Sequence, residues 1–186
     1  MAQLASALAW GARGREFESH RSDFFYLSNT MKAKERLDGI IEYFKIHMAT
    51  PETELYYHSE YQLAVAVILS AQCTDKRVNI ITPPLFERFP DFNTMATATH
   101  EEVFEYIKSC SYPNNKTKHL IGLAQKIVEE YEGKLPEDTK TLMSLPGIGR
   151  KTAHVLLSVL KNADVLAVDT HVFRVSHRIG LVNSKA

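Results

Sequence analysis

A short segment near residue 147 constrains the fold more than any other part of the chain. It reads Leu145-Pro-Gly-Ile-Gly-Arg-Lys151. Pro146 ends a preceding helix, and Gly147 and Gly149 permit backbone conformations that other residues avoid. Apolar residues then return at the spacing of one buried helix face, as Ala153, Leu156, Leu157 and Leu160. The segment therefore predicts two helices joined by a tight turn.

The predicted turn has the chemistry of an anion site. Two glycines and a helix start leave backbone N–H groups pointing outward, at the positive end of the helix dipole. Such a site suits one phosphate, with Arg150 and Lys151 beside it. The alternative is a plain hairpin between two antiparallel helices. Because 22 basic residues balance 22 acidic ones, nucleic-acid binding would have to depend on local donors of this kind.

The rest of the chain predicts an all-α fold. Its length of 186 residues and 45% hydrophobic content suffice for one compact domain plus part of another. The run from Leu63 to Leu69 is apolar all round, and its alanines favour a buried helix, although a buried strand has the same pattern. No apolar run approaches the length of about 20 residues that a membrane span needs. Besides a helix that begins at Met31, we expect helices at 60–70, 74–88, 100–109, 115–131, 138–145, 150–161 and 170–178.

Residues 1–30 differ in character from the rest, and we expect them to be an extension outside the fold. A targeting peptide is disfavoured because Glu16, Glu18 and Asp23 do not suit an acid-depleted leader. The two cysteines, Cys73 and Cys110, form neither a disulfide framework nor a metal pattern. We expect both to be ordinary thiols in a reducing cytoplasm.

The hairpin segment resembles, almost letter for letter, the helix-hairpin-helix of the endonuclease III family of base-excision repair glycosylases. The resemblance extends from Met31 to the end of the chain. It implies a helix-hairpin-helix glycosylase fold, with a six-helix domain at 49–162 and an incomplete second helical domain built from 31–48 and 163–186. It also implies a bacterial, nucleoid-associated monomer in the cytoplasm. The implied partner is double-stranded DNA with a damaged base or an abasic site, and no membrane.

The resemblance implies two catalytic residues. A lysine at the mouth of the second hairpin helix is the family's nucleophile, and Lys151 matches it. Arg150 and the helix start disfavour its charged form, which a nucleophilic amine must lose. Asp169, in Ala167-Val-Asp-Thr-His171, matches the second catalytic position, where a carboxylate stabilises positive charge on the sugar. The structural alternative for Asp169 is a helix N-cap, which is compatible with catalysis.

Further residues are implied to bind DNA. Gln72, in Leu69-Ser-Ala-Gln-Cys-Thr-Asp75, matches the glutamine that fills the gap left by the flipped nucleotide. Tyr112 takes the position of the family's aliphatic wedge. The alternatives are a polar helix end at Gln72 and a rigid turn at Pro113. The implied DNA-binding set is Gln72, Tyr112, Gly147, Gly149, Arg150 and Thr152. The family hairpin also binds a cation through main-chain carbonyls, here those of Met143, Leu145 and Ile148.

The sequence departs from the family at its C-terminal end. Relatives carry four cysteines there that hold a [4Fe-4S] cluster, and none is present here, so we expect no cofactor on this chain. We expect the chain to be truncated before that segment, which leaves Asp169 with fewer packing partners. The expected function is a bifunctional glycosylase that removes oxidised pyrimidines and cleaves 3′ of the abasic site by β-elimination. The alternative is a helix-hairpin-helix DNA-binding fragment without catalysis.

Overall fold

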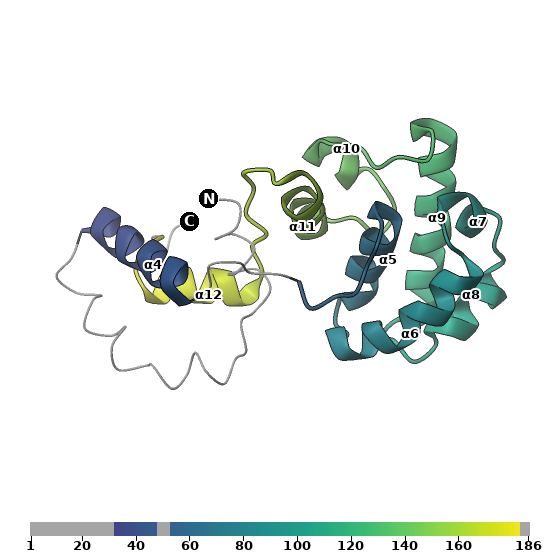
Figure 1. The fold of residues 1–186 in the computed structure, drawn as a ribbon, viewed down its shortest axis with the longest axis horizontal. Helices are drawn as coiled ribbons and strands as arrows, with labels where there is room; N and C mark the ends of the chain where they lie inside the picture. Colours follow the sequence, from purple (N-terminus) through teal and green to yellow (C-terminus); the bar gives the residue numbers. More distant parts are fainter. Residues whose placement is uncertain (1–31, 48–52, 183–186) are drawn as a thin grey trace. The chain divides into compact units, whose positions relative to one another are not determined.

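The computed structural model describes residues 32–47 and 53–182. Within these residues every regular element is a helix, which confirms the all-α prediction (Figure 1). The helices are α4 (Ala33–His47), α5 (Glu60–Ser70), α6 (Asp75–Arg88), α7 (Phe92–Ala96), α8 (His100–Ile107), α9 (Pro113–Tyr131), α10 (Thr139–Met143), α11 (Arg150–Lys161) and α12 (Thr170–Arg178). No helix in these ranges is both long and apolar enough to cross a membrane. The expected extension at 1–30 lies outside the described residues.

One helix was not predicted, and the boundaries of the others shift by up to two residues from the sequence-based expectation. The short helix α7 was not predicted, because five residues show no clear period; it begins at a capping box in which Asp91 and Thr94 bond to each other's backbone. Helix α9 begins at Pro113, two residues before the expected start, since proline fits the first position of a helix. Helix α10 ends at Met143, earlier than predicted. The remaining boundaries agree within about two residues, the usual uncertainty of helix ends.

The chain divides into two compact units, which we describe separately. One contains α5 to α11 within Glu54–Lys161, and the other contains α4 together with the segment that follows Asn162. In the second of these units, Ile40 and Phe44 of α4 are buried, and Arg36 Nη2 donates to the carbonyl of Gly180 at 2.9 Å. The helix near the N-terminus thus bonds to the segment after α12. The domain boundaries at 48 and 162 stay a proposal.

Helix α5 is the centre of the unit at Glu54–Lys161. Ser59 caps its start by accepting a hydrogen bond from the backbone N–H of Gln62, and every residue from Leu63 to Leu69 is buried. The helix packs against α6, α9 and α11. Full burial of each large aliphatic side chain contributes roughly 1.5–3 kcal/mol. Because the run from Leu63 to Leu69 is buried on every side, it needs no alternation of apolar and polar residues, which explains why the sequence pattern alone could not distinguish it from a strand.

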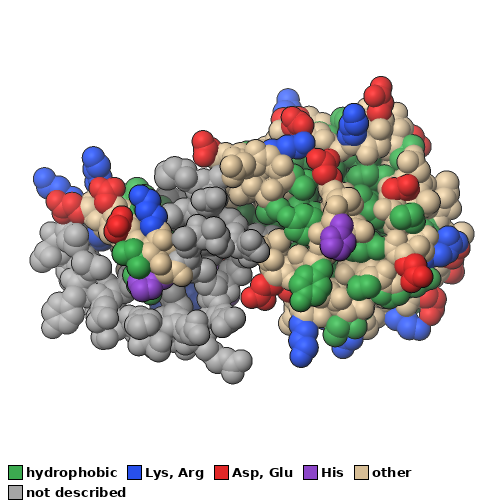
Figure 2. Space-filling model, in the orientation of Figure 1, with side chains coloured by type: hydrophobic (Ala, Val, Ile, Leu, Met, Phe, Trp, Pro, Cys, Tyr) green, Lys and Arg blue, Asp and Glu red, His purple; other side chains and the backbone are tan. Residues whose placement is uncertain are grey.

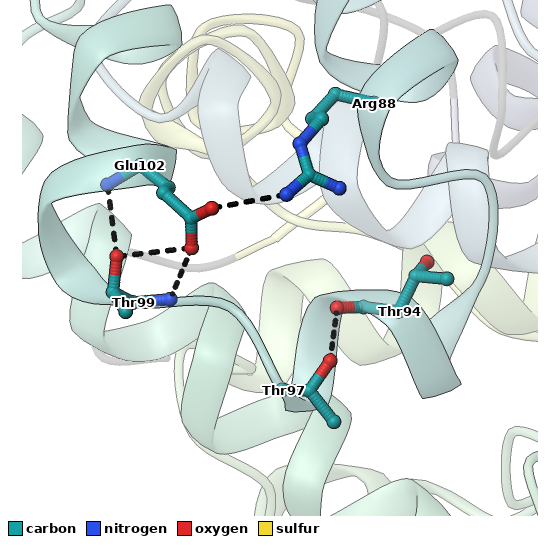
Figure 3. Close-up of polar contacts among 5 residues, drawn as sticks. All are labelled: Arg88, Thr94, Thr97, Thr99 and Glu102. Carbon is teal, nitrogen blue, oxygen red and sulfur yellow. Dashed lines mark hydrogen bonds and ion pairs between the residues drawn. The ribbon is translucent and has the colours of Figure 1, made fainter.

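The start of α8 is fixed by a reciprocal cap (Figure 3). The carboxylate of Glu102 accepts from the backbone N–H of Thr99 at 2.9 Å, while Thr99 Oγ1 accepts from the backbone N–H of Glu102 at 3.3 Å. Arg88 Nη2, from the end of α6, lies 3.0 Å from Glu102 Oε1. The backbone N–H of Thr99 is the largest cause that lowers the pKa of Glu102, and Arg88 adds to it. One carboxylate therefore joins the end of α6 to the start of α8.

This cap predicts a pH-dependent contribution to stability. Because the pKa of Glu102 is lower in the folded chain than its usual value of 4.5, its ionised form stabilises the fold. That contribution is fully present above about pH 4.5 and is lost as pH falls through the lower folded pKa. We expect Glu102→Gln to lower the thermal midpoint at pH 7 by a small amount, and the difference from the unmodified chain to shrink by pH 3. Glu101→Gln, in the same helical turn, is the control; an equal drop for both variants at pH 7 would contradict the prediction.

Candidate functional site

The predicted hairpin is formed by α10, a tight turn and α11. Asp138 caps α10 by accepting a hydrogen bond from the backbone N–H of Thr141 at 2.9 Å. Gly147 has φ +78°, and a Cβ atom there would lie 2.9 Å from His119 Cβ, so the turn requires glycine. At Gly149, by contrast, a Cβ atom would meet nothing within 4 Å. Gly147 therefore serves the packing of the turn, whereas Gly149 leaves the backbone open at the start of α11.

A hollow of about 600 Å³ lies beside the hairpin. Its lining combines the basic residues Lys140, Arg150 and His154 with two hydroxyl groups and one apolar side chain, those of Thr139, Ser144 and Met143. Leu145 and Ile148, two of the three residues whose carbonyls were predicted to hold a cation, are buried, and the carbonyl of Leu145 accepts from the N–H of Ile148 at 3.2 Å. The predicted cation site stays a prediction, and the basic lining suits an anion.

Lys151 is exposed in the first turn of α11, and it interacts electrostatically with the carboxyl group of Asp75. Burial is the largest cause that raises the pKa of Asp75, Glu54 raises it further, and Lys151 lowers it. Asn79 fixes the segment that carries Glu54, because its side chain donates to the Glu54 carbonyl at 2.7 Å and accepts from the Tyr56 N–H at 3.0 Å. The sequence predicted positive groups around Lys151, and the structure adds the carboxyl group of Asp75.

Asp169 lies in the unit that contains α4 and α12. Its Oδ1 accepts from the backbone N–H of Val172 at 2.8 Å, and its side chain caps the start of α12. The N-cap role expected from the sequence is therefore confirmed. Asp169 is partly buried, and Val172, whose N–H donates the capping hydrogen bond, is 3% exposed. The catalytic role of Asp169 stays a prediction.

Gln72 and Tyr112 are brought close together by two loops of the unit at Glu54–Lys161. Gln72 follows the end of α5 and is exposed, and Tyr112 precedes α9 and is 64% exposed. Both have φ +54°, a left-handed conformation that residues other than glycine rarely adopt. The hydroxyl of Ser111 donates to the carbonyl of Gln72, which joins the two loops directly. The structure thus places side by side two residues that the sequence assigned to one task.

The same two loops bring the cysteines together. Cys73 Sγ and Cys110 Sγ lie 3.7 Å apart, and both thiols are free. Burial, followed by the neighbouring Cys73, raises the pKa of Cys110 to about 11. Cys110 therefore stays protonated at neutral pH and behaves as a small apolar side chain. The pairing was missed because 37 residues separate the two positions, and the sequence holds no signal for such a contact.

The cysteines do not fit the four-cysteine cluster that the family resemblance implies. The sequence contains two cysteines, and they face each other between loops. Within the described ranges 32–47 and 53–182, no group of three or more His, Cys, Asp or Glu side chains could hold a metal ion.

Charges on the face of the unit at Glu54–Lys161 that is in view are mixed. Figure 2 shows basic and acidic side chains interspersed around its edge, with apolar side chains between them. This distribution matches the balanced composition of the chain. Binding of a polyanion at this face would depend on placed donors and not on a broad positive field.

Comparison with known proteins identifies the family. Residues 65–186 match the model of the HhH-GPD superfamily base excision DNA repair proteins. Endonuclease III of Rickettsia felis is 42% identical over 150 residues, which cover 81% of this chain and 70% of that protein. Endonuclease III of Synechocystis sp. is 44% identical over 154 residues, with coverages of 81% and 69%.

Solved structures give the same result. An endonuclease III in a non-covalent DNA complex and one in a trapped covalent DNA intermediate each superimpose with a TM-score of 0.78 at 35% identity, covering 84% of this chain and 73% of theirs. A thermostable thymine-DNA glycosylase shares the fold at 21% identity and a TM-score of 0.63. Since both sequence and structure match over most of the chain, this protein belongs to the endonuclease III family of base-excision DNA repair glycosylases.

Proposed function

We propose that this chain binds duplex DNA at the hairpin between α10 and α11 and cleaves it through Lys151. The observation that carries the proposal is the position of Lys151 in the first turn of α11, two residues after the open backbone of Gly149. A phosphate bound at the helix start would bring the adjoining sugar within reach of the amine. One of the structural relatives is a covalent endonuclease III–DNA intermediate, which supports this assignment.

The reaction begins when the amine of Lys151 attacks C1′ of the damaged nucleotide. A C1′–N bond to lysine forms, the bond from C1′ to the base breaks, and the base leaves with a proton. The nitrogen lone pair then expels O4′, which takes a proton from water, so the C1′–O4′ bond breaks and a protonated Schiff base forms. The Schiff base makes the C2′ proton acidic, and loss of that proton expels the 3′ phosphate by β-elimination. Asp75 gives the amine an acidic neighbour that can hold a proton close to the reacting group, and burial together with Glu54 raises its pKa.

Asp169 is proposed to stabilise the positive charge that develops on the sugar as the base departs. A cap bond to the Val172 N–H fixes its carboxylate at the start of α12. Because the cap restricts the side chain to one orientation, capping and catalysis are compatible uses of the same group. The same carboxylate would stabilise the start of α12 in the free protein and the positive charge on the sugar in the DNA complex.

DNA recognition is proposed to combine hairpin donors with two inserted side chains. The N–H groups near Gly147 and Gly149, with Arg150 and Thr152, would bind phosphate. Gln72 would fill the gap left by the flipped nucleotide, and Tyr112 would stack on its orphaned partner. The proposed substrates are oxidised pyrimidines and abasic sites in double-stranded DNA. The chain would act as a monomer at the bacterial nucleoid.

Covalent trapping tests the nucleophile. Mixing the chain with duplex DNA that contains one abasic site, in the presence of borohydride, should give a covalent protein–DNA product. Lys151→Gln should lower the yield at least about 100-fold, while DNA affinity falls by less than about tenfold, because only one of several contacts is lost. If the folded unmodified chain binds this DNA and gives no product, the hairpin is a DNA-binding element without catalysis.

The two hairpin glycines predict opposite phenotypes. Gly147→Ala should lower the free energy of unfolding by about 1–3 kcal/mol, because its positive φ and the close His119 contact both oppose a methyl group. Gly149→Ala should change that free energy by less than about 0.5 kcal/mol, since its surroundings are open. It should still weaken duplex binding several-fold by covering the backbone donors. Urea unfolding and a binding titration measure both effects; unchanged binding by Gly149→Ala would refute a phosphate contact there.

A further inference from the structure

A buried lysine links the two loops that carry Gln72 and Tyr112. Lys116 lies in the first turn of α9, four residues after Tyr112, and is 5% exposed. Its Nζ donates to the carbonyl of Leu69 at 2.8 Å and to that of Ala71 at 2.8 Å. Both carbonyls lie at the end of α5, directly before Gln72. The side chain therefore extends from the base of one loop to the base of the other.

The end of α5 explains why an ammonium group is accepted there. The last carbonyls of a helix have no partner within the helix and carry its negative dipole end. The chain turns at Gln72, so the backbone cannot continue the pattern of helical hydrogen bonds. Burial lowers the pKa of Lys116, and no carboxylate is among the causes of that shift. Lys116 is thus held by backbone carbonyls, and two of its three protons bond to them.

A second hydrogen bond joins the tips of the same loops. The hydroxyl of Ser111 donates to the carbonyl of Gln72, and the two cysteine sulfurs meet between these points. Gln72 and Tyr112 both adopt the left-handed conformation, which persists only when surrounding contacts determine it. Lys116, in α9, and Ser111, in the loop before α9, supply such contacts. We call these two residues the loop clamp.

We propose that the loop clamp, Lys116 with Ser111, sets the separation and orientation of Gln72 and Tyr112 so that both can enter the duplex at one flipped nucleotide. The inference rests on the proposed function, in which those two side chains replace the extruded nucleotide. The clamp residues need not touch DNA themselves. They are positioning residues, because they act through the backbone conformation of Gln72 and Tyr112.

Fluorescence of a stacked base tests the clamp without requiring chemistry. The probe is a duplex that carries 2-aminopurine beside a tetrahydrofuran abasic analogue, which the enzyme cannot cleave. Insertion of Gln72 and Tyr112 should unstack the 2-aminopurine and raise its fluorescence. At saturating protein, we expect Lys116→Met to reduce this rise at least threefold and Ser111→Ala to reduce it in the same direction. Lys118→Met, an exposed lysine of the same helix, should give the full rise.

The readout separates the possible outcomes. Amplitude at saturation does not depend on stability, provided that circular dichroism shows a folded chain; if Lys116→Met does not fold, Ser111→Ala decides. A full rise with the folded clamp variants, or no rise with the bound unmodified chain, would overturn the clamp. Failure of borohydride trapping with a normal fluorescence rise would refute the lyase chemistry and leave the clamp supported, so the two proposals fail separately.

Discussion

The burial of the apolar run Leu63–Leu69 of α5 is the constraint on which both parts of the candidate DNA interface depend. Its side chains from Leu63 to Leu69 are buried against α6, α9 and α11. Helix α11 carries Lys151, and the end of α5 leads into Gln72. Since a close-packed interior transmits small shifts, a change in the axis of α5 would move both Lys151, the proposed nucleophile, and Gln72, which is proposed to fill the gap left by the flipped nucleotide. The central helix would thus align the proposed lysine chemistry with the proposed base flipping.

The features predicted from the sequence are those that local patterns determine. The turn at Gly147 and Gly149, the amphipathic face of α11 and the cap at Asp169 each depend on residues within a few positions of one another. Helix α7 was missed because its five residues are too few to show a period, although its capping pair at Asp91 and Thr94 was a visible signal. Fold class therefore followed from local physics and from the resemblance.

The candidate site was predicted less completely, because several of its contacts join distant residues. Lys116 bonds to carbonyls 45 and 47 residues before it. The interaction of Asp75 with Lys151 joins the start of α6 to the start of α11. No spacing rule indicates such pairs in a single sequence. Asp75 ends the same segment that contains Gln72, so the charged residue of that segment could have been proposed as a partner of Lys151. Lys116 resembles any surface lysine until the fold buries it.

Two lysines of this unit show how burial assigns chemical roles to one residue type. Lys116 is surrounded, and its ammonium is committed to two carbonyls, so it cannot leave its place without exposing unsatisfied backbone groups. Lys151 is exposed at the start of α11, where it interacts with Asp75 and where its amine is open to an approaching molecule. A nucleophile needs an approachable amine, whereas a positioning residue needs a fixed one. Because the chain carries equal numbers of basic and acidic residues, its affinity for DNA would depend on where each lysine is placed and not on net charge.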